Sequence, residues 1–261
     1  MQRNSGKLSA LRLALAIDVA IYHVCLISGV RPSWLTPFLV PTLAVQIFFV
    51  LSGYLIFVSL ARTNGLWDYL QRRMMRIYPA YLLVVAASGA VFSPTASNWL
   101  SYVAWNAVFL NFVAPGDVGG FAINGSLWTI KVEVAFYIVA PGLFAAAMRY
   151  GAMRVLGAAI VGSLLYRAAM HDSLLAHQFP GQLCLFAAGG LIHFYGYRFV
   201  SILAAMPQLR MPRRDLSYGI YLVHFPIAHV FRSFGVIAIP LTLLASIAVA
   251  SFLARLPTSS L

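Results

Sequence analysis

Three ionisable residues interrupt an apolar stretch near the start of the sequence, LRLALAIDVAIYHV, residues 11–24. They are Arg12, Asp18 and His23, and a charged group at the centre of a membrane helix costs about 2.5–3.5 kcal/mol on insertion scales. Histidine has an unperturbed pKa of about 6.5, so it can accept and return a proton near neutral pH. The stretch is therefore a candidate site of acid–base chemistry, with His23 as the base.

Arg12 and His23 are expected on one face of the first helix. Eleven residues separate them, and at 3.6 residues per turn and 1.5 Å per residue they lie within ~20° of one another and ~16 Å apart along the axis. The pair could mark two ends of one cavity, Arg12 near the cytoplasmic surface and His23 in the outer half of the bilayer. Asp18 is one turn from Tyr22, where the two can pair. The structural alternative is a snorkelling Arg12 and a packed, hydrogen-bonded His23.

A second group of basic residues lies in QRRMMRIYPAYL, residues 71–82. Arg73 and Arg76 are spaced i, i+3, so they share a helix face beside Arg72 and just before Pro79. The planar guanidinium grips phosphates through two parallel hydrogen bonds. The cluster predicts contact with a phosphate-bearing ligand from the cytoplasm, and its alternative role is a topology anchor.

Two further polar sets stand in apolar runs. Glu133 and Tyr137 are spaced i, i+4 and share a face; a carboxylate in lipid must find a partner or a proton. An ion pair between Glu133 and an arginine is the structural alternative. Ser217, Tyr221 and His224, at i, i+4 and i+7, form a polar stripe that could line a substrate site or hold helices together.

These residues must be positioned by membrane helices. The chain of 261 residues is 61% hydrophobic and 9% charged, with a mean hydropathy of +0.85, and its apolar runs approach the ~20 residues that cross a bilayer. The pattern predicts an all-α fold, a polytopic transmembrane helical bundle of eight to ten spans. The strong spans are residues 8–30, 37–61, 77–93, 127–148, 154–170, 178–197, 216–234 and 237–255, and the weak ones 99–113 and 199–206.

The net charge of +12 comes from 18 Lys and Arg against 6 Asp and Glu. The basic residues lie in the joins between apolar runs, as expected for positive-inside topology and anionic-lipid contact rather than nucleic-acid binding. Arg3 and Lys7 place the N-terminus in the cytoplasm, and either span count returns the C-terminus there. Cys25 and Cys184 lie in apolar runs and make no disulfide framework.

No soluble module interrupts the pattern, so residues 1–261 are expected to form one integral membrane domain with a retained first span. The sequence contains no Walker loop, no HExxH and no Cys/His ligand spacing, so neither ATP-driven chemistry nor a metal is expected.

Together these motifs resemble the acyltransferase 3 family of membrane O-acyltransferases, which acylate cell-surface glycans in bacteria. The resemblance rests on Arg12 and His23 separated by ten residues, FFVLSGYLI (48–56), the RRxxRIxP element from Arg72 to Pro79, WTIKVEVAFYIVAP (128–141) and LSYGIYLVH (216–224). It implies an acyl-CoA donor, usually acetyl-CoA, and an acceptor hydroxyl on a sugar. His23 matches the family's proposed catalytic histidine, and Arg73 with Arg76 match its cytoplasmic Arg-x-x-Arg element.

On this resemblance we predict a bacterial inner-membrane acyltransferase for polysaccharide O-acetylation, multi-pass, with both termini cytoplasmic. Its partners would be acyl-CoA, a glycan or glycolipid acceptor and the lipid bilayer. His23 would be the general base or a transient acyl carrier, with Asp18 or Glu133 orienting it. The expected CoA phosphate ligands are Arg12, Arg72, Arg73 and Arg76.

Compared with the family, the C-terminal part is expected to be shortened. Two alternatives remain open. One is a transporter or flippase with a buried ionisable pathway, which would show internal repeats and broken helices in two halves. The other is a catalytically inactive family member that binds a partner.

Overall fold

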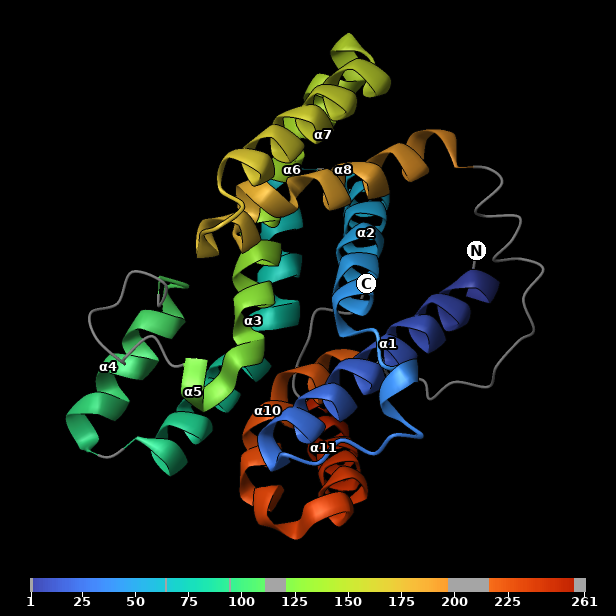
Figure 1. The fold of residues 1–261 in the computed structure, drawn as a ribbon. Helices are drawn as coiled ribbons and strands as arrows, with labels where there is room; N and C mark the ends of the chain where they lie inside the picture. Colours follow the sequence, from blue (N-terminus) through green and yellow to red (C-terminus); the bar gives the residue numbers. More distant parts are fainter. Residues whose placement is uncertain (1, 64, 94, 111–120, 197–215, 256–261) are drawn as a thin grey trace. The chain divides into compact units, whose positions relative to one another are not determined.

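The computed structural model describes residues 2–63, 65–93, 95–110, 121–196 and 216–255 (Figure 1). In these ranges the chain is helical and contains no strand, which confirms the predicted all-α class. The α-helices are α1 (Gln2–Ser28), α2 (Pro41–Leu60), α3 (Leu66–Phe92), α4 (Ala96–Ala107), α5 (Phe121–Asn124), α6 (Trp128–Tyr150), α7 (Ala152–Ala169), α8 (Phe179–Tyr195), α10 (Ser217–Phe231) and α11 (Ala238–Leu253). Short 3₁₀ helices are η1 (Thr36–Phe38), η3 (Gly125–Leu127), η4 (Leu174–His177) and η5 (Arg232–Ile237).

Six segments of the described chain are long and apolar enough to cross a membrane. They are Gly6–Ser28, Thr36–Leu60, Leu66–Phe92, Gly125–Tyr150, Ala152–Ala169 and Ser217–Leu253, the last of which contains α10, η5 and α11. The multi-pass helical prediction is thus confirmed. Of the weak runs, 99–113 overlaps α4 and extends beyond the described residues, and 199–206 lies outside them. The choice between eight and ten spans stays a prediction.

Helix boundaries and bends follow local chemistry. Thr95 precedes α4, and its Oγ1 accepts the backbone N–H of Asn98 at 3.2 Å, as an N-cap does. Gly151 alone joins α6 to α7 with φ +95°, a conformation that glycine adopts without a Cβ clash. Prolines stand inside α3, α6 and α10, where each removes one backbone N–H from the helix ladder.

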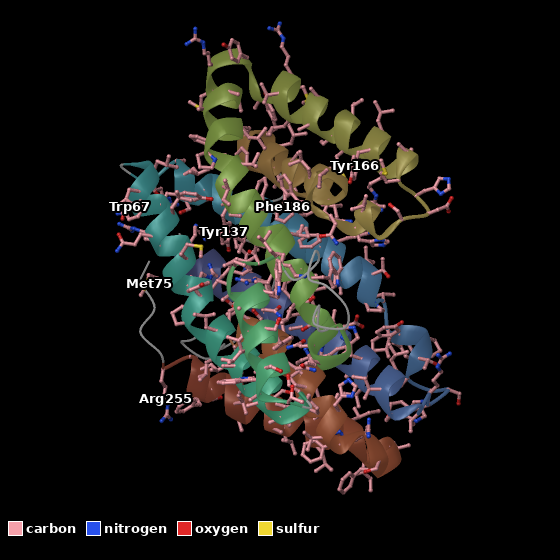
Figure 2. All side chains as sticks on the ribbon, turned by 90° about the vertical axis from the view of Figure 1, so that its left-hand side faces the viewer. Trp67, Met75, Tyr137, Tyr166, Phe186 and Arg255 are labelled. Carbon is pink, nitrogen blue, oxygen red and sulfur yellow. The ribbon has the colours of Figure 1, made fainter. Side chains whose placement is uncertain are left out.

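The chain divides into two compact units. The first contains residues 1–7, 45–74 and 128–209, and its core is aromatic: the rings of Phe136 and Phe186 stack at 4.2 Å, and Phe49 lies 4.9 Å from Phe186. Helices α2 and α8 meet at backbone contact, because a Cβ on Gly53 would lie 2.2 Å from the Phe186 carbonyl oxygen. Figure 2 shows Tyr137 and Phe186 among the side chains of this unit.

The second unit contains residues 8–44, 75–127 and 210–261. Helix α1 packs against α10 and α11 through a buried cluster of Val24, Cys25, Ala228, Ala238 and Ile239, and α10 and α11 lie side by side (Figure 1). Cys25 and Cys184 are both buried and free, as the sequence predicts. The expectation of one domain over residues 1–261 stays a prediction.

Candidate active site

A pair of histidines from distant parts of the sequence forms the centre of the candidate site. Nδ1 of His23, on α1, lies 2.8 Å from Nε2 of His224, on α10. The ring centroids are 5.1 Å apart with an interplanar angle of 17°. His224 is fully buried, whereas His23 is only half-buried, and the Phe225 ring meets His23 edge-on at 5.2 Å. Only His23 of this pair is open to a substrate.

Helix α10 holds His224 in place with the help of two side chains, Asn124 at the end of α5 and Ser126 in η3. Pro226 has no N–H for the carbonyl of Leu222, four residues earlier. Nδ2 of Asn124 donates to this carbonyl at 2.9 Å, and Ser126 donates to the neighbouring carbonyl of Tyr221 at 3.3 Å. Side chains from outside α10 thus supply hydrogen bonds to carbonyl oxygens of the turn that precedes Pro226, beside His224.

Asn124 and Ser126 also bond to one another. Oγ of Ser126 donates to Oδ1 of Asn124 at 2.6 Å, and both side chains are buried. Gly125 between them is packed closely, because a Cβ there would lie 3.0 Å from the Phe225 ring. This segment therefore docks against the same turn of α10 that carries His224.

Asp18 has a different partner from the one expected. Its Oδ1 accepts the backbone N–H of Val40 at 3.2 Å, directly before α2, and not a bond from Tyr22. Its Oδ2 has no hydrogen-bond partner in the described part of the chain. Asp18 therefore ties the segment before α2 to α1, because a side-chain acceptor offsets a backbone donor that the helix leaves unpaired. The imidazole of His23 bonds to His224 rather than to Asp18.

The second cluster of predicted residues lies in the first unit. Glu133 Oε1 accepts hydrogen bonds from the hydroxyls of Tyr137, at 2.9 Å, and Ser52, at 3.0 Å. The predicted shared face of Glu133 and Tyr137 is confirmed. The alternative ion pair to an arginine is wrong for the described residues, where Glu133 is bonded by hydroxyl groups of α2 and α6.

The arginines of α3 occupy three different environments. Arg73 is 4% exposed, and its guanidinium lies 5.8 Å from the Tyr69 ring and 5.9 Å from the Tyr137 ring. Arg72 is exposed and pairs with Asp68 at 2.7 Å. Arg76, one turn after Arg73, is half-buried. Arg12, on α1, is also half-buried.

The predicted stripe on α10 faces the protein interior. Ser217, Tyr221 and His224 are all buried, and Tyr218 next to them donates to the carbonyl of Ile77 at 3.0 Å. The three residues therefore share a packed face, and from this face His224 reaches His23.

Sequence reasoning missed Ser52, Asn124 and Ser126, and it missed the partnership of His23 with His224. A signal for Asn124 was present, because Pro226 leaves a carbonyl unpaired and an adjacent polar segment, NGS, is available to bond it. Within the described ranges, no three His, Cys, Asp or Glu side chains lie together so that they could hold a metal ion.

A family model described as "Acyltransferase domain" matches residues 6–205. An O-acetyl transferase of Shigella phage Sf6 is 28% identical over 199 residues, covering 71% of this chain and 59% of the relative. Nodulation protein 10 of Rhizobium leguminosarum bv. viciae is 23% identical over an alignment of 305 residues, covering 86% and 83%.

A putative acetyltransferase, ORF330 of Acidianus two-tailed virus, is 28% identical over 148 residues, covering 54% and 42%. The chain thus spans 59% of the length of the phage relative. No solved structure matches the chain. Since the family model covers well over half of the sequence, the chain belongs to the acyltransferase domain family, the acyltransferase 3 family that its motifs indicate.

Proposed function

We propose that this chain is a membrane acyltransferase that moves an acyl group, most simply acetyl, from acyl-CoA to a hydroxyl of a cell-surface or exported glycan. It would act from the bacterial inner membrane, with both termini in the cytoplasm. The observation that carries the proposal is the environment of His23 in a member of an acyltransferase family. Its Nδ1 bonds to His224 while the side chain is only half-buried, so one nitrogen is held and the other is available.

The proposed step uses His23 as a general base. Nε2 takes the proton of the acceptor hydroxyl as the oxygen attacks the thioester carbonyl, the C–S bond breaks, and the proton passes to the sulfur to give the free thiol of CoA. General-base catalysis contributes about 10²- to 10⁴-fold. A variant of the same scheme has His23 carry the acyl group transiently on its ring.

We propose phosphate-binding roles for Arg12, Arg72 and Arg76, which are half-buried or exposed. The ~16 Å along α1 between Arg12 and His23 would then separate the phosphate end of the donor from its thioester. Arg73 is enclosed by two tyrosine rings, so we assign it to the packing of α3 against α6 instead. For Glu133, which lies in the first unit, we keep the proposed role of a carboxylate that supports the catalytic histidine.

The test measures acyl transfer directly. The full chain is purified in detergent and given [¹⁴C]acetyl-CoA with a panel of bacterial cell-surface polysaccharides, and both thiol release and labelled polysaccharide are counted. We expect His23→Ala to lower transfer at least 10²-fold. The control is His171→Ala, since His171 is exposed and its ion-pair partner in the described ranges is the neighbouring Asp172.

Undiminished transfer by His23→Ala would remove His23 from the mechanism. Absence of both thiol release and labelled product from the wild-type chain would favour a transporter or an inactive member of the family over an enzyme.

The arginine proposal has its own readout, CoA affinity. A hydrogen bond to a charged group contributes about 1.5–3 kcal/mol, so Arg76→Ala should raise the Kd for CoA by about 10- to 150-fold. Competition with dephospho-CoA and with pantetheine, which lack one or all of the phosphates of CoA, shows whether the lost affinity belongs to the phosphates. An unchanged Kd would mean that the arginines of α3 act in membrane topology and helix packing and not in CoA binding.

A further inference from the structure

The hydrogen bonds of His224 specify where its ring proton lies. Nδ1 of His224 is 3.2 Å from the carbonyl oxygen of Ile220, one turn earlier on α10. A carbonyl oxygen can only accept, so Nδ1 must carry the hydrogen. In the neutral ring, Nε2 is then an acceptor.

This choice fixes the ring proton of His23 as well. The Nδ1···Nε2 distance of 2.8 Å requires one donor and one acceptor, and since His224 Nε2 accepts, His23 Nδ1 must donate. A neutral His23 therefore has its lone pair on Nε2. No residue in the described ranges hydrogen-bonds to that nitrogen.

The arrangement of the rings supports a directed bond. The interplanar angle is 17° and the centroid separation is 5.1 Å, close to the N···N distance plus the two ring radii. The imidazoles therefore lie edge to edge in nearly one plane and not face to face. In this geometry the N–H of one ring points along the lone pair of the other, and Phe225, edge-on against His23, restricts rotation of the ring.

We propose that His224 is a positioning residue that sets the tautomer and orientation of His23. The inference rests on the proposed function, since it gives His23 the form that a general base requires. His224 is 0% exposed, so it acts only through His23 and cannot touch a substrate.

The supporting contacts extend one layer further. Asn124 and Ser126 bond the carbonyls of Leu222 and Tyr221, in the turn of α10 that carries His224. A side chain that orients a reacting histidine is effective only if its own backbone is held. Hydrogen-bond partners of metal-ligating histidines change metal affinity or activity by about 10- to 100-fold, and we use this range for the partner of His23.

In the reaction, the acceptor proton moves to Nε2 of His23 and the ring becomes an imidazolium. The Nδ1–H bond to His224 Nε2 remains in place through this change, and it becomes a charge-assisted bond, which is stronger than a neutral one. When the proton passes to the leaving sulfur, His23 returns to the same tautomer. No proton needs to leave the histidine pair by any other route.

Two substitutions of His224 distinguish the effect of losing the hydrogen-bond acceptor from the effect of losing the ring's volume. His224→Leu removes the acceptor, and His224→Gln places an amide oxygen near the position of Nε2, where it can accept from His23. We expect His224→Leu to lower kcat by about 10- to 100-fold with KM for acetyl-CoA little changed, and His224→Gln to recover most of the loss. His193→Leu is the matched control: it is the same change on α8 in the first unit, and His193 contacts the rings of Phe57, Phe144 and Phe194.

A wild-type kcat in His224→Leu would overturn the proposal. Equal losses in the Leu and Gln variants, both folded by thermal melting and gel filtration, would also overturn it, because a purely structural role predicts no recovery by an acceptor.

A second readout does not depend on activity. In protein labelled with [¹⁵N]histidine, ring nitrogens with and without hydrogen have distinct chemical shifts, and a His23→Asn sample identifies the signals of His23. We expect a protonated Nδ1 and an unprotonated Nε2 in the wild type, with the Nε2–H form appearing in His224→Leu. Identical His23 shifts in both proteins would refute the role of His224. If the chain proves not to be an acyltransferase, the expected shifts stay the same, so the two proposals fail separately.

Discussion

The crossing of α2 and α8 gives a sharp test of the packing of the first unit. Gly53 and Gly189 bring the two backbones together: a Cβ on Gly53 would lie 2.2 Å from the carbonyl oxygen of Phe186, and one on Gly189 would lie 2.1 Å from that of Val50. Ordinary contact begins at 3.4 Å, so Gly53→Ala requires the helices to separate by about 1.2 Å, the difference between 3.4 and 2.2 Å. The atoms in the way belong to the backbone, which cannot rotate aside.

Phe186 cannot shift easily, because its ring stacks at 4.2 Å on Phe136 and lies 4.9 Å from Phe49. Overpacking of this kind costs about 1–3 kcal/mol, and rigid backbone atoms favour the upper end. Replacing a helical glycine by alanine returns about 1 kcal/mol. We therefore expect Gly53→Ala to lower the free energy of unfolding by about 2 kcal/mol, which corresponds to a Tm about 4–8 °C lower.

The assay is thermal unfolding of the purified chain in detergent, followed by circular dichroism. Gly157→Ala is the control, because Gly157 lies inside α7 and a Cβ there would meet nothing within 4 Å; its Tm should stay the same or rise. If Gly53→Ala melts at or above the wild-type temperature, α2 and α8 do not meet at backbone contact and the reasoning fails.

Two other contacts give further predictions. Asn124→Ala leaves the Leu222 carbonyl buried and unpaired, so the free energy of unfolding should fall by about 1–3 kcal/mol. Pro226→Ala restores the helix N–H and should reduce the cost of Asn124→Ala, which thermal melting of the single and double variants measures. An equal cost of Asn124→Ala with and without Pro226→Ala would contradict the pairing. Tyr137→Phe removes one of two hydroxyl donors to Glu133, so it should destabilise the chain by about 0.5–1.5 kcal/mol, and an unchanged Tm would show that this bond carries no net stability.

Much of the helical framework could be predicted from the sequence, because a helix in lipid must satisfy its own backbone and therefore appears as one apolar run. The runs at 8–30 and 127–148 correspond to α1 and α6. Contacts within one helix followed in the same way: the i, i+4 spacing of Glu133 and Tyr137 predicted a shared face, and the hydroxyl bonds the carboxylate at 2.9 Å.

Contacts between helices could not be predicted in this way. Periodicity states which residues share a face and not what the face meets, so the stripe of Ser217, Tyr221 and His224 gave no indication that its last member bonds to His23, 201 residues away. The partner of Asp18 was missed for another reason. It is a backbone N–H, that of Val40, and since every residue except proline carries one, sequence holds no mark of it.

Asp18 and His23 of α1 show that an unusual residue in a membrane helix does not by itself identify a reacting group. Asp18 serves a backbone donor, which is a structural task. A histidine with only a structural task in lipid should bond through both ring nitrogens, because an unsatisfied polar group there costs several kcal/mol. His224 meets that description, with Nδ1 on Ile220 and Nε2 on His23. His23 bonds within the described chain only through Nδ1, and this asymmetry between the two paired histidines is the reason we propose His23 as the reacting ring and His224 as its support.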